Sequence, residues 1–74
     1  MTRILEPATL ALAIRERRKA LGYTQARLAS LCGTGVRFIS DLENAKSTVE
    51  LGKVLAVVAT LGLDLYLAER GAEA

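Results

Sequence analysis

The 74-residue sequence contains no histidine, one cysteine, one proline and three aromatic residues. A single cysteine excludes an internal disulfide, and the absence of histidine excludes cysteine–histidine metal sites and a histidine base. We therefore expect neither a metal nor another cofactor. Cys32 suits a reducing cytosol and is expected to be a small buried apolar residue. The three aromatic side chains, Tyr23, Phe38 and Tyr66, are too few to form a stacking platform for single-stranded nucleic acid.

Long apolar segments are also missing. The longest largely apolar run, residues 54–63, is too short to span a bilayer and lies between Lys53 and Asp64. The first residues lack the apolar stretch of a signal peptide. We therefore expect one cytoplasmic domain with no membrane partner.

Charge of one sign is not in large excess, since ten basic and eight acidic residues give a net charge of +2. The basic residues are clustered, however, in the segment that contains Arg15, Arg17, Arg18 and Lys19. Such a cluster is commonly a solvated helix face. Beside a nucleic-acid-binding motif it becomes a candidate phosphate-facing patch.

Helical periodicity and capping residues predict the first two helices. The first begins at Pro7, whose missing N–H would be unpaired at a helix start anyway, and stops at Gly22. The second follows Thr24, a good N-cap, and Tyr23 is spaced to pack on Leu28 as a hydrophobic staple.

Two further helices follow. The third starts after Gly35 and ends near Asn44. Ser47 and Glu50 have the spacing of a capping box, which predicts that the fourth helix begins close to Thr48.

The segment from residue 25 to residue 44 has the pattern of a helix-turn-helix. Its apolar residues stand where the two helices of the motif must pack together: Leu28, Ala29, Ile39 and Leu42. Gly33 stands at the bend, where a positive φ carries no steric cost for glycine. The second helix of such a motif is free to enter a DNA groove.

After Gly62 the apolar residues alternate with a period of two, which predicts a β-strand over residues 63–69. A single strand cannot satisfy its own backbone groups, and the chain offers no second strand. We therefore expect the strand to pair antiparallel with its copy in a homodimer. The fourth helix carries more apolar residues than one small core needs, and the dimer would cover them. The expected dimer residues are Leu63, Leu65, Tyr66 and Leu67. A frayed or helical tail is the alternative.

These patterns predict a mostly α fold with a flexible N-terminal arm (1–6), a helix-turn-helix domain (7–62), a dimerisation strand (63–69) and a flexible tail (70–74). No catalytic residues are expected, because Asp41 and Glu43 point in different directions on one helix and no activated nucleophile is evident.

The segment from Arg18 to Lys46 resembles the DNA-binding domain of the phage repressor and Cro superfamily, often called the Xre family. The sequences RFISDLEN and TVELGKVL and the terminal strand are similar to those of HipB-like antitoxins. The resemblance implies a four-helix lambda-repressor-like domain that binds a palindromic double-stranded DNA operator as a homodimer, at the nucleoid. It also implies a HipA-like kinase toxin as partner. A free-standing or prophage repressor, or an interaction module that does not read DNA, remain alternatives.

Four residues on the third helix correspond to base-reading positions of the family: Val36, Arg37, Ser40 and Asp41. Arg37 can donate two hydrogen bonds to a guanine, whereas Val36 can contact a thymine methyl. Asp41 can accept from a cytosine amino group or orient Arg37. A plain surface charge is the alternative for Arg37.

The resemblance also implies a set of phosphate contacts: Gln25, Arg27, Asn44 and Lys46. Gln25 opens the second helix, where a side chain and a helix N-terminus can clamp a phosphate together. Its alternative is a routine polar residue of the first turn. Arg15 and Lys53 are weaker candidates for phosphate contacts.

Arg18 and Glu43 match a buried ion pair of the family, which we interpret as a structural strut. The chain departs from the family at Ala45, usually glycine, which predicts local backbone strain, and at Gly35, a weaker cap than serine or threonine. Phe38 either packs in the core or lies half exposed near the DNA backbone.

Overall fold

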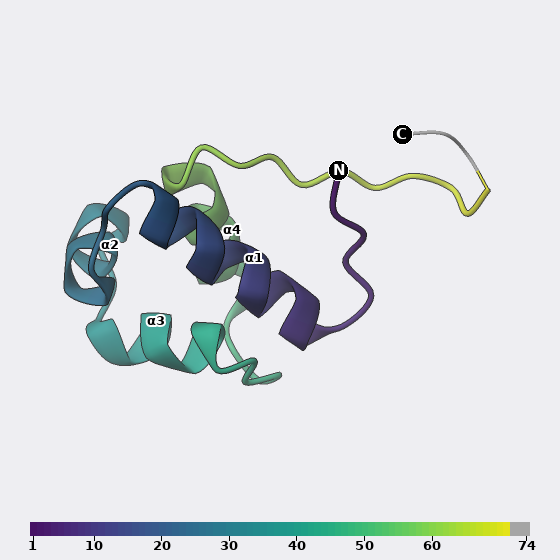
Figure 1. Cartoon of the computed structure of the whole chain (residues 1–74). Helices are drawn as coiled ribbons and strands as arrows, with labels where there is room; N and C mark the ends of the chain where they lie inside the picture. The colour runs from purple at the N-terminus through teal and green to yellow at the C-terminus, as the bar shows by residue number, and fades with distance from the viewer. Residues whose placement is uncertain (72–74) are drawn as a thin grey trace.

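The computed structural model describes residues 1–71 and contains four helices in that range. They are α1 (Pro7–Ala20), α2 (Gln25–Cys32), α3 (Val36–Glu43) and α4 (Leu51–Thr60). Helix α2 packs against both α3 and α4, and α1 packs against α3 (Figure 1). The mostly α architecture predicted from the sequence is therefore confirmed.

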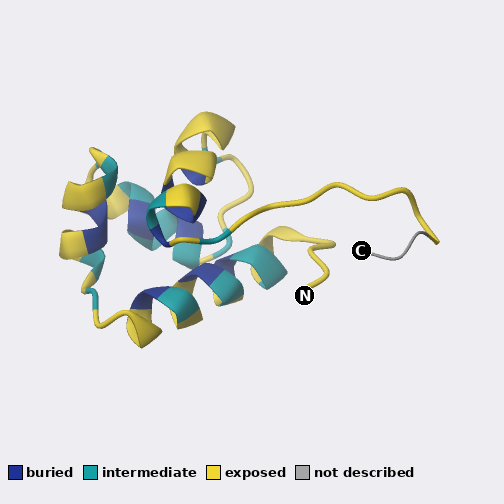
Figure 2. Ribbon diagram, turned by 90° about the horizontal axis from the view of Figure 1, so that it is seen from above, coloured by how far each residue is buried: buried dark blue, intermediate teal, exposed yellow. Residues whose placement is uncertain are grey.

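The core lies where the four helices meet, with exposed residues on the outer faces (Figure 2). Its buried residues are Ile14, Leu28, Ala29, Ile39, Leu42, Val54, Val57, Val58 and Leu61. Cys32 packs against this core but is only half-buried, so the expectation of a buried cysteine is met in part.

The helix-turn-helix begins and bends as the capping residues predict. Thr24 Oγ1 accepts a hydrogen bond from the Arg27 N–H at 3.0 Å, and Tyr23 packs against the core that contains Leu28. Gly33 ends α2 with φ of 71°, in the left-handed region that favours glycine. Gly35 precedes α3 without a side-chain cap.

The predicted capping box before α4 is wrong. The helix begins at Leu51 rather than near Thr48, and Glu50 is its extended N-cap residue with no side-chain cap. The Glu50 carboxylate lies 3.6 Å from Lys53 Nζ instead. Val49 packs against the core that includes Val54, at the spacing of a hydrophobic staple, so tertiary packing places the helix start after Val49.

The residues that follow α4 carry no helix or strand from 63 to 69 and extend away from the helices (Figure 1). Leu63 packs against the core, whereas Leu65, Tyr66 and Leu67 are exposed. A strand needs a second strand to pair with, and residues 1–71 of a single chain supply none. The paired strand thus remains a prediction. Of the predicted flexible tail, residues 72–74 lie outside the described residues.

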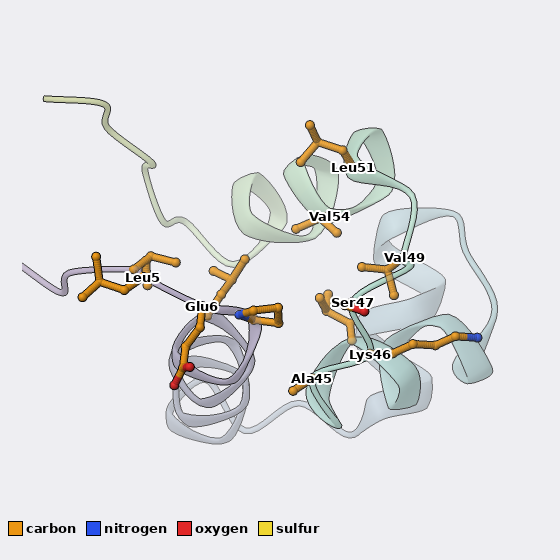
Figure 3. Close-up of a pocket in the computed structure, with 12 residues that line it drawn as sticks. Leu5, Glu6, Ala45, Lys46, Ser47, Val49, Leu51 and Val54 are labelled. Carbon is orange, nitrogen blue, oxygen red and sulfur yellow. The ribbon is translucent and has the colours of Figure 1, made fainter. Parts of the chain in front are cut away.

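The N-terminal arm, residues 1–6, is exposed and forms no helix or strand. It borders an apolar groove of about 400 Å³ that also reaches the loop after α3 and the start of α4 (Figure 3). Leu5, Val49 and Leu51 are among its lining residues. None of the helices in residues 1–71 combines the length and apolarity needed to cross a bilayer.

Candidate nucleic-acid interface

An ion pair joins the first helix to the end of the third. Arg18 Nε lies 2.6 Å from Glu43 Oε2, and Arg18 Nη2 donates to Glu43 Oε1 at 2.9 Å. The two side chains retain only 10% and 3% of their accessible surface. Arg18 Nη1 also donates to the Tyr23 carbonyl at 2.8 Å, which ties the α1–α2 turn to the pair. The expected strut between Arg18 and Glu43 is therefore present.

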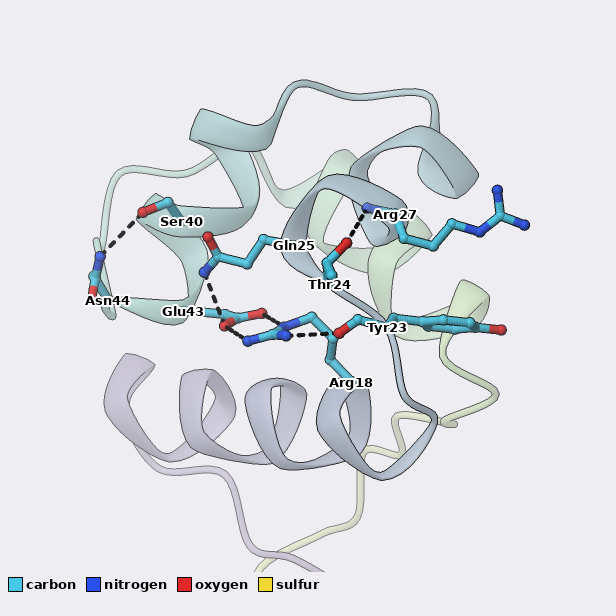
Figure 4. Close-up of polar contacts among 8 residues, drawn as sticks. All are labelled: Arg18, Tyr23, Thr24, Gln25, Arg27, Ser40, Glu43 and Asn44. Atoms are coloured by element: carbon cyan, nitrogen blue, oxygen red, sulfur yellow. Dashed lines mark hydrogen bonds and ion pairs between the residues drawn. The ribbon is translucent and has the colours of Figure 1, made fainter.

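A third side chain joins this pair from α2. Gln25 Nε2 donates to Glu43 Oε1 at 3.2 Å, so the carboxylate receives donors from α1 and α2 (Figure 4). Sequence reasoning missed this bond. No local signal marks it, because the two residues stand 18 positions apart and meet only through the packing of α2 on α3.

Glu43 and Arg18 each shift the pKa of the other. Burial alone would raise the pKa of Glu43, but hydrogen bonds from Arg18 and Gln25, with the charges of Arg18 and Arg15, outweigh it and hold that pKa below 4.5. The hydrogen bond to Glu43 raises the pKa of Arg18, against the opposing effect of burial. Both groups are therefore ionised at neutral pH.

Helix α3 has one face in the core and one facing outward. Ile39 and Leu42 are buried, whereas Val36 and Arg37 at its N-terminal end are exposed. Ser40 and Asp41, one turn further on, are half-buried. Residues four apart on a helix lie on the same face, so these four proposed base-reading residues share one outward face.

The carboxylate of Asp41 is paired within the chain. It lies 3.6 Å from Lys46 Nζ, with both side chains partly exposed. In the free chain Asp41 does not pair with Arg37, whose side chain has no ion pair or hydrogen bond within residues 1–71. The base-reading role of Asp41 remains a prediction. The chain turns back after α3 through Ala45, with φ of 63°, and the Lys46 N–H donates to the Asp41 carbonyl at 3.0 Å. That turn brings the two side chains together.

The proposed phosphate residues do not all lie together. Gln25, Ser40 and Asn44 gather on one side of the view in Figure 4, where Asn44 Nδ2 donates to Ser40 Oγ at 3.4 Å. The guanidinium of Arg27 points to the other side. Hydrogen bonds thus tie Gln25 and Asn44 to residues of α3, whereas the Arg27 guanidinium points away from them in this view.

The basic cluster of α1 is divided between structural and exposed residues. Arg18 is buried in the ion pair, and Arg17 Nε donates to the Leu61 carbonyl at the end of α4 at 2.9 Å. Only Arg15 and Lys19 remain exposed. The cluster is therefore not a single phosphate-facing patch.

The Lys53 ammonium lies over the ring of Phe38. Phe38 is half-buried against the core, and Lys53 Nζ lies 5.7 Å from the centre of its ring. This distance is within the range of a cation–π contact. Phe38 therefore packs against the core while staying partly exposed, which is compatible with both expectations for it, and Lys53 lies at the α3–α4 contact and beside Glu50.

The fold and the outward face of α3 define a helix-turn-helix protein. The family model HTH_3, helix-turn-helix, matches residues 14–67. An uncharacterized HTH-type transcriptional regulator of Sinorhizobium fredii (strain NBRC 101917 / NGR234), y4mF, is 42% identical over 69 residues, covering 93% of this chain and 91% of its own.

Solved structures of HipB share the whole fold. A HipB–O2 20mer complex matches with a TM-score of 0.86 and 30% identity, covering 95% of this chain and 97% of that one. A HipA–HipB–O2–O3 complex matches with the same TM-score at 28% identity, covering 95% and 99%. The chain therefore belongs to the Xre-like helix-turn-helix family of transcriptional regulators, and its structure is HipB-like.

Proposed function

We propose that this chain is a dimeric, sequence-specific repressor that binds a palindromic double-stranded operator through α3. It also serves as the antitoxin of a HipA-like kinase toxin and represses its own operon. This role is one of binding, without catalysis, and it is exercised in the cytoplasm at the nucleoid.

One observation carries the DNA-binding part of the proposal. Helix α3 buries Ile39 and Leu42 and leaves Val36 and Arg37 exposed at its N-terminal end. The N-terminal residues of a recognition helix are those that reach base edges in the major groove. The Arg37 side chain has no ion pair or hydrogen bond within residues 1–71, which leaves its guanidinium available for a guanine.

The similar HipB complexes support the rest of the proposal. Two contain HipB with the 20mers O2 and O4, and another contains HipA, HipB, O2 and O3. A chain with the same fold over nearly its whole length can present the same surfaces to a DNA duplex and to a kinase of the HipA type.

Binding to duplex DNA from upstream of its own gene tests the function. Arg37→Ala should weaken binding by about 1–3 kcal/mol and relax the base preference at one position in each half-site. Arg70→Ala, an exposed arginine on the tail, is the matched control and should leave the preference intact. An equal loss on every sequence would reassign Arg37 to the phosphates, and no retention of any duplex would refute the function.

The charged and the uncharged phosphate contacts should differ in how they change the salt dependence of binding. Lys46→Ala should weaken binding to all duplexes and reduce the slope of log affinity against log salt by about one per site. Gln25→Ala should also weaken binding uniformly, but with the slope unchanged, because glutamine displaces no counterion. In the free chain the Lys46 ammonium lies 3.6 Å from Asp41, with both side chains partly exposed, so it can reach a phosphate from there.

The toxin partnership has its own test. Helix α3 faces the DNA, so a HipA-like kinase should bind a different surface and form a complex with the DNA-bound dimer. Mixing the kinase with the labelled protein–duplex complex should give a larger species that still contains the duplex. Full displacement of the duplex at saturating kinase would contradict this arrangement.

A further inference from the structure

The side chain of Glu43, at the C-terminal end of α3, is buried and accepts hydrogen bonds from two other helices. Glu43 Oε1 accepts from both Arg18 Nη2 at 2.9 Å and Gln25 Nε2 at 3.2 Å. We propose that Glu43 is a positioning residue for DNA binding, which holds the Gln25 side-chain amide with its nitrogen available to a backbone phosphate. This inference rests on the proposed function, since it concerns the same surface.

The chemistry of the amide explains why it needs to be held. A glutamine side chain ends in a carbonyl oxygen, which only accepts hydrogen bonds, and an NH₂ group, which donates two. A phosphate is itself an acceptor, so only the NH₂ end can bind it. An amide that turned by half a rotation would face the phosphate with its oxygen, and the contact would be lost.

Glu43 selects the productive orientation. Its ionised carboxylate accepts hydrogen bonds and cannot donate, so it bonds only to the nitrogen end of Gln25. One N–H of Gln25 is then committed to Glu43, and the other stays available to a phosphate. Gln25 is half-exposed, which gives this second N–H access to a ligand from outside.

Glu43 is itself held in place. Arg18 contacts both of its oxygens, and the Glu43 side chain retains only 3% of its accessible surface. Arg18 in turn donates to the Tyr23 carbonyl, just before α2. The amide is thus fixed from α1 and α3 together, and little conformational freedom remains to be lost when DNA binds.

A double-mutant cycle separates this role from a purely structural one. Gln25→Ala and Glu43→Asp are combined, and binding to an upstream duplex and to a random-sequence duplex is measured. Glu43→Asp keeps the negative charge near Arg18 but shortens the side chain by one methylene, so it does not reach both partners. Far-UV circular dichroism and thermal melting verify that each variant is folded at the assay temperature.

In the parent chain, Gln25→Ala should weaken binding to both duplexes about tenfold, as loss of a hydrogen bond to a charged group does. In the Glu43→Asp background the same change should cost less than about twofold, because the amide is no longer positioned. The salt slope should stay constant throughout, since Gln25 carries no charge. Equal losses in the two backgrounds would overturn the inference while leaving the proposed function standing.

The free protein supplies a second measurement that does not depend on DNA. In nitrogen-15 spectra, the Gln25 side-chain NH₂ should show slowed hydrogen exchange in the parent chain, and this protection should be lost in Glu43→Asp. Protection that survives in a folded Glu43→Asp variant would overturn the inference. Failure of the parent chain to bind any duplex, with the protection intact, would instead refute the proposed function.

Discussion

Ala45 adopts a backbone conformation that glycine accommodates better. Its φ is 63°, and it is the one non-glycine residue with a positive φ in residues 1–71. The Ala45 N–H donates to the Leu42 carbonyl at 3.1 Å and the Lys46 N–H to the Asp41 carbonyl at 3.0 Å. These two bonds form a Schellman motif, in which the residue at the position of Ala45 is usually glycine.

Ala45→Gly should therefore stabilise the domain. The left-handed conformation costs an L-residue roughly 1–2 kcal/mol, part of which is offset by the greater freedom of glycine in the unfolded chain. We expect a gain of about 0.5–1 kcal/mol in the free energy of unfolding, measured in urea. Ala56→Gly in the exposed part of α4 is the matched control and should lose about 1 kcal/mol. A loss in both variants would contradict the strain at Ala45.

Glu43 should make stability depend on acid pH. Its pKa in the folded chain lies below 4.5, so the unfolded state binds the proton more readily. The stabilisation is thus complete above the unfolded pKa and is lost as pH falls through the lower folded pKa. Glu43→Gln leaves Arg18 unpaired and should cost about 3–5 kcal/mol at neutral pH.

Urea unfolding at a series of pH values checks this expectation. The difference between the parent chain and Glu43→Gln should shrink steadily below about pH 4.5. Lys19→Ala, an exposed basic residue of α1 whose charge does not act on Glu43, should show a small difference that changes little. A difference for Glu43→Gln that is independent of pH would show that the ion pair does not contribute to stability.

The start of α4 is the helix boundary that we predicted wrongly from the sequence. Glu50 is the N-cap residue but caps nothing with its side chain. Glu50→Asp brings a shorter carboxylate within reach of the first free N–H groups and should stabilise the chain by about 1 kcal/mol. Ser47→Ala should have almost no effect. If α4 began near Thr48, the Ser47 change would instead be the costly one, and melting curves of the two variants decide between these starts.

The helix boundaries that the sequence predicted correctly depend on residues close in the chain. Thr24 caps α2 and Gly33 ends it, and both act within one helical turn. The start of α4 depends instead on Val49, which packs into a core built from distant segments. The spacing of Ser47 and Glu50 alone does not reveal whether a capping box or the packing of Val49 determines where α4 begins.

The candidate site likewise contains some features that the sequence predicted and others that it did not. The outward positions of Val36 and Arg37 follow from helical periodicity, and the Arg18–Glu43 pair follows from the family resemblance. The Gln25–Glu43 bond and the Asp41–Lys46 pair were not predicted. The first depends on how α2 packs against α3, and the second depends on the turn at Ala45, so neither is set by local spacing.

At the scale of the whole molecule, apolar surface remains uncovered. Leu51 and Leu55 of α4 are 68% and 48% exposed, although Val54, Val57 and Val58 of the same helix are buried. The tail adds Leu65, Tyr66 and Leu67, which are 46%, 72% and 104% exposed. Large exposed apolar side chains on a helix and on the segment that follows it commonly mark a protein–protein contact.

We expect a second copy of the chain to cover this surface through the segment 63–69. Its residues alternate with a period of two, and its backbone forms no strand ladder within residues 1–71. Antiparallel pairing with the same segment of another chain satisfies those groups by a two-fold axis, which makes the contact self-complementary. Such a dimer would place two copies of α3 about one DNA turn apart, roughly 34 Å.

Leu65→Pro tests the paired strand, because proline removes a backbone donor and restricts φ. Dimerisation, measured by sedimentation, and operator binding should fall together, while circular dichroism shows that the helices persist. Asp64→Ala is the control, since it keeps the backbone donor and changes a side chain that is exposed in the single chain. A chain ending at Gly62 should be monomeric and bind the operator weakly, since each half-site is then held independently. If that shortened chain remains a tight dimer with full operator affinity, the interface lies among the helices and the strand model is wrong.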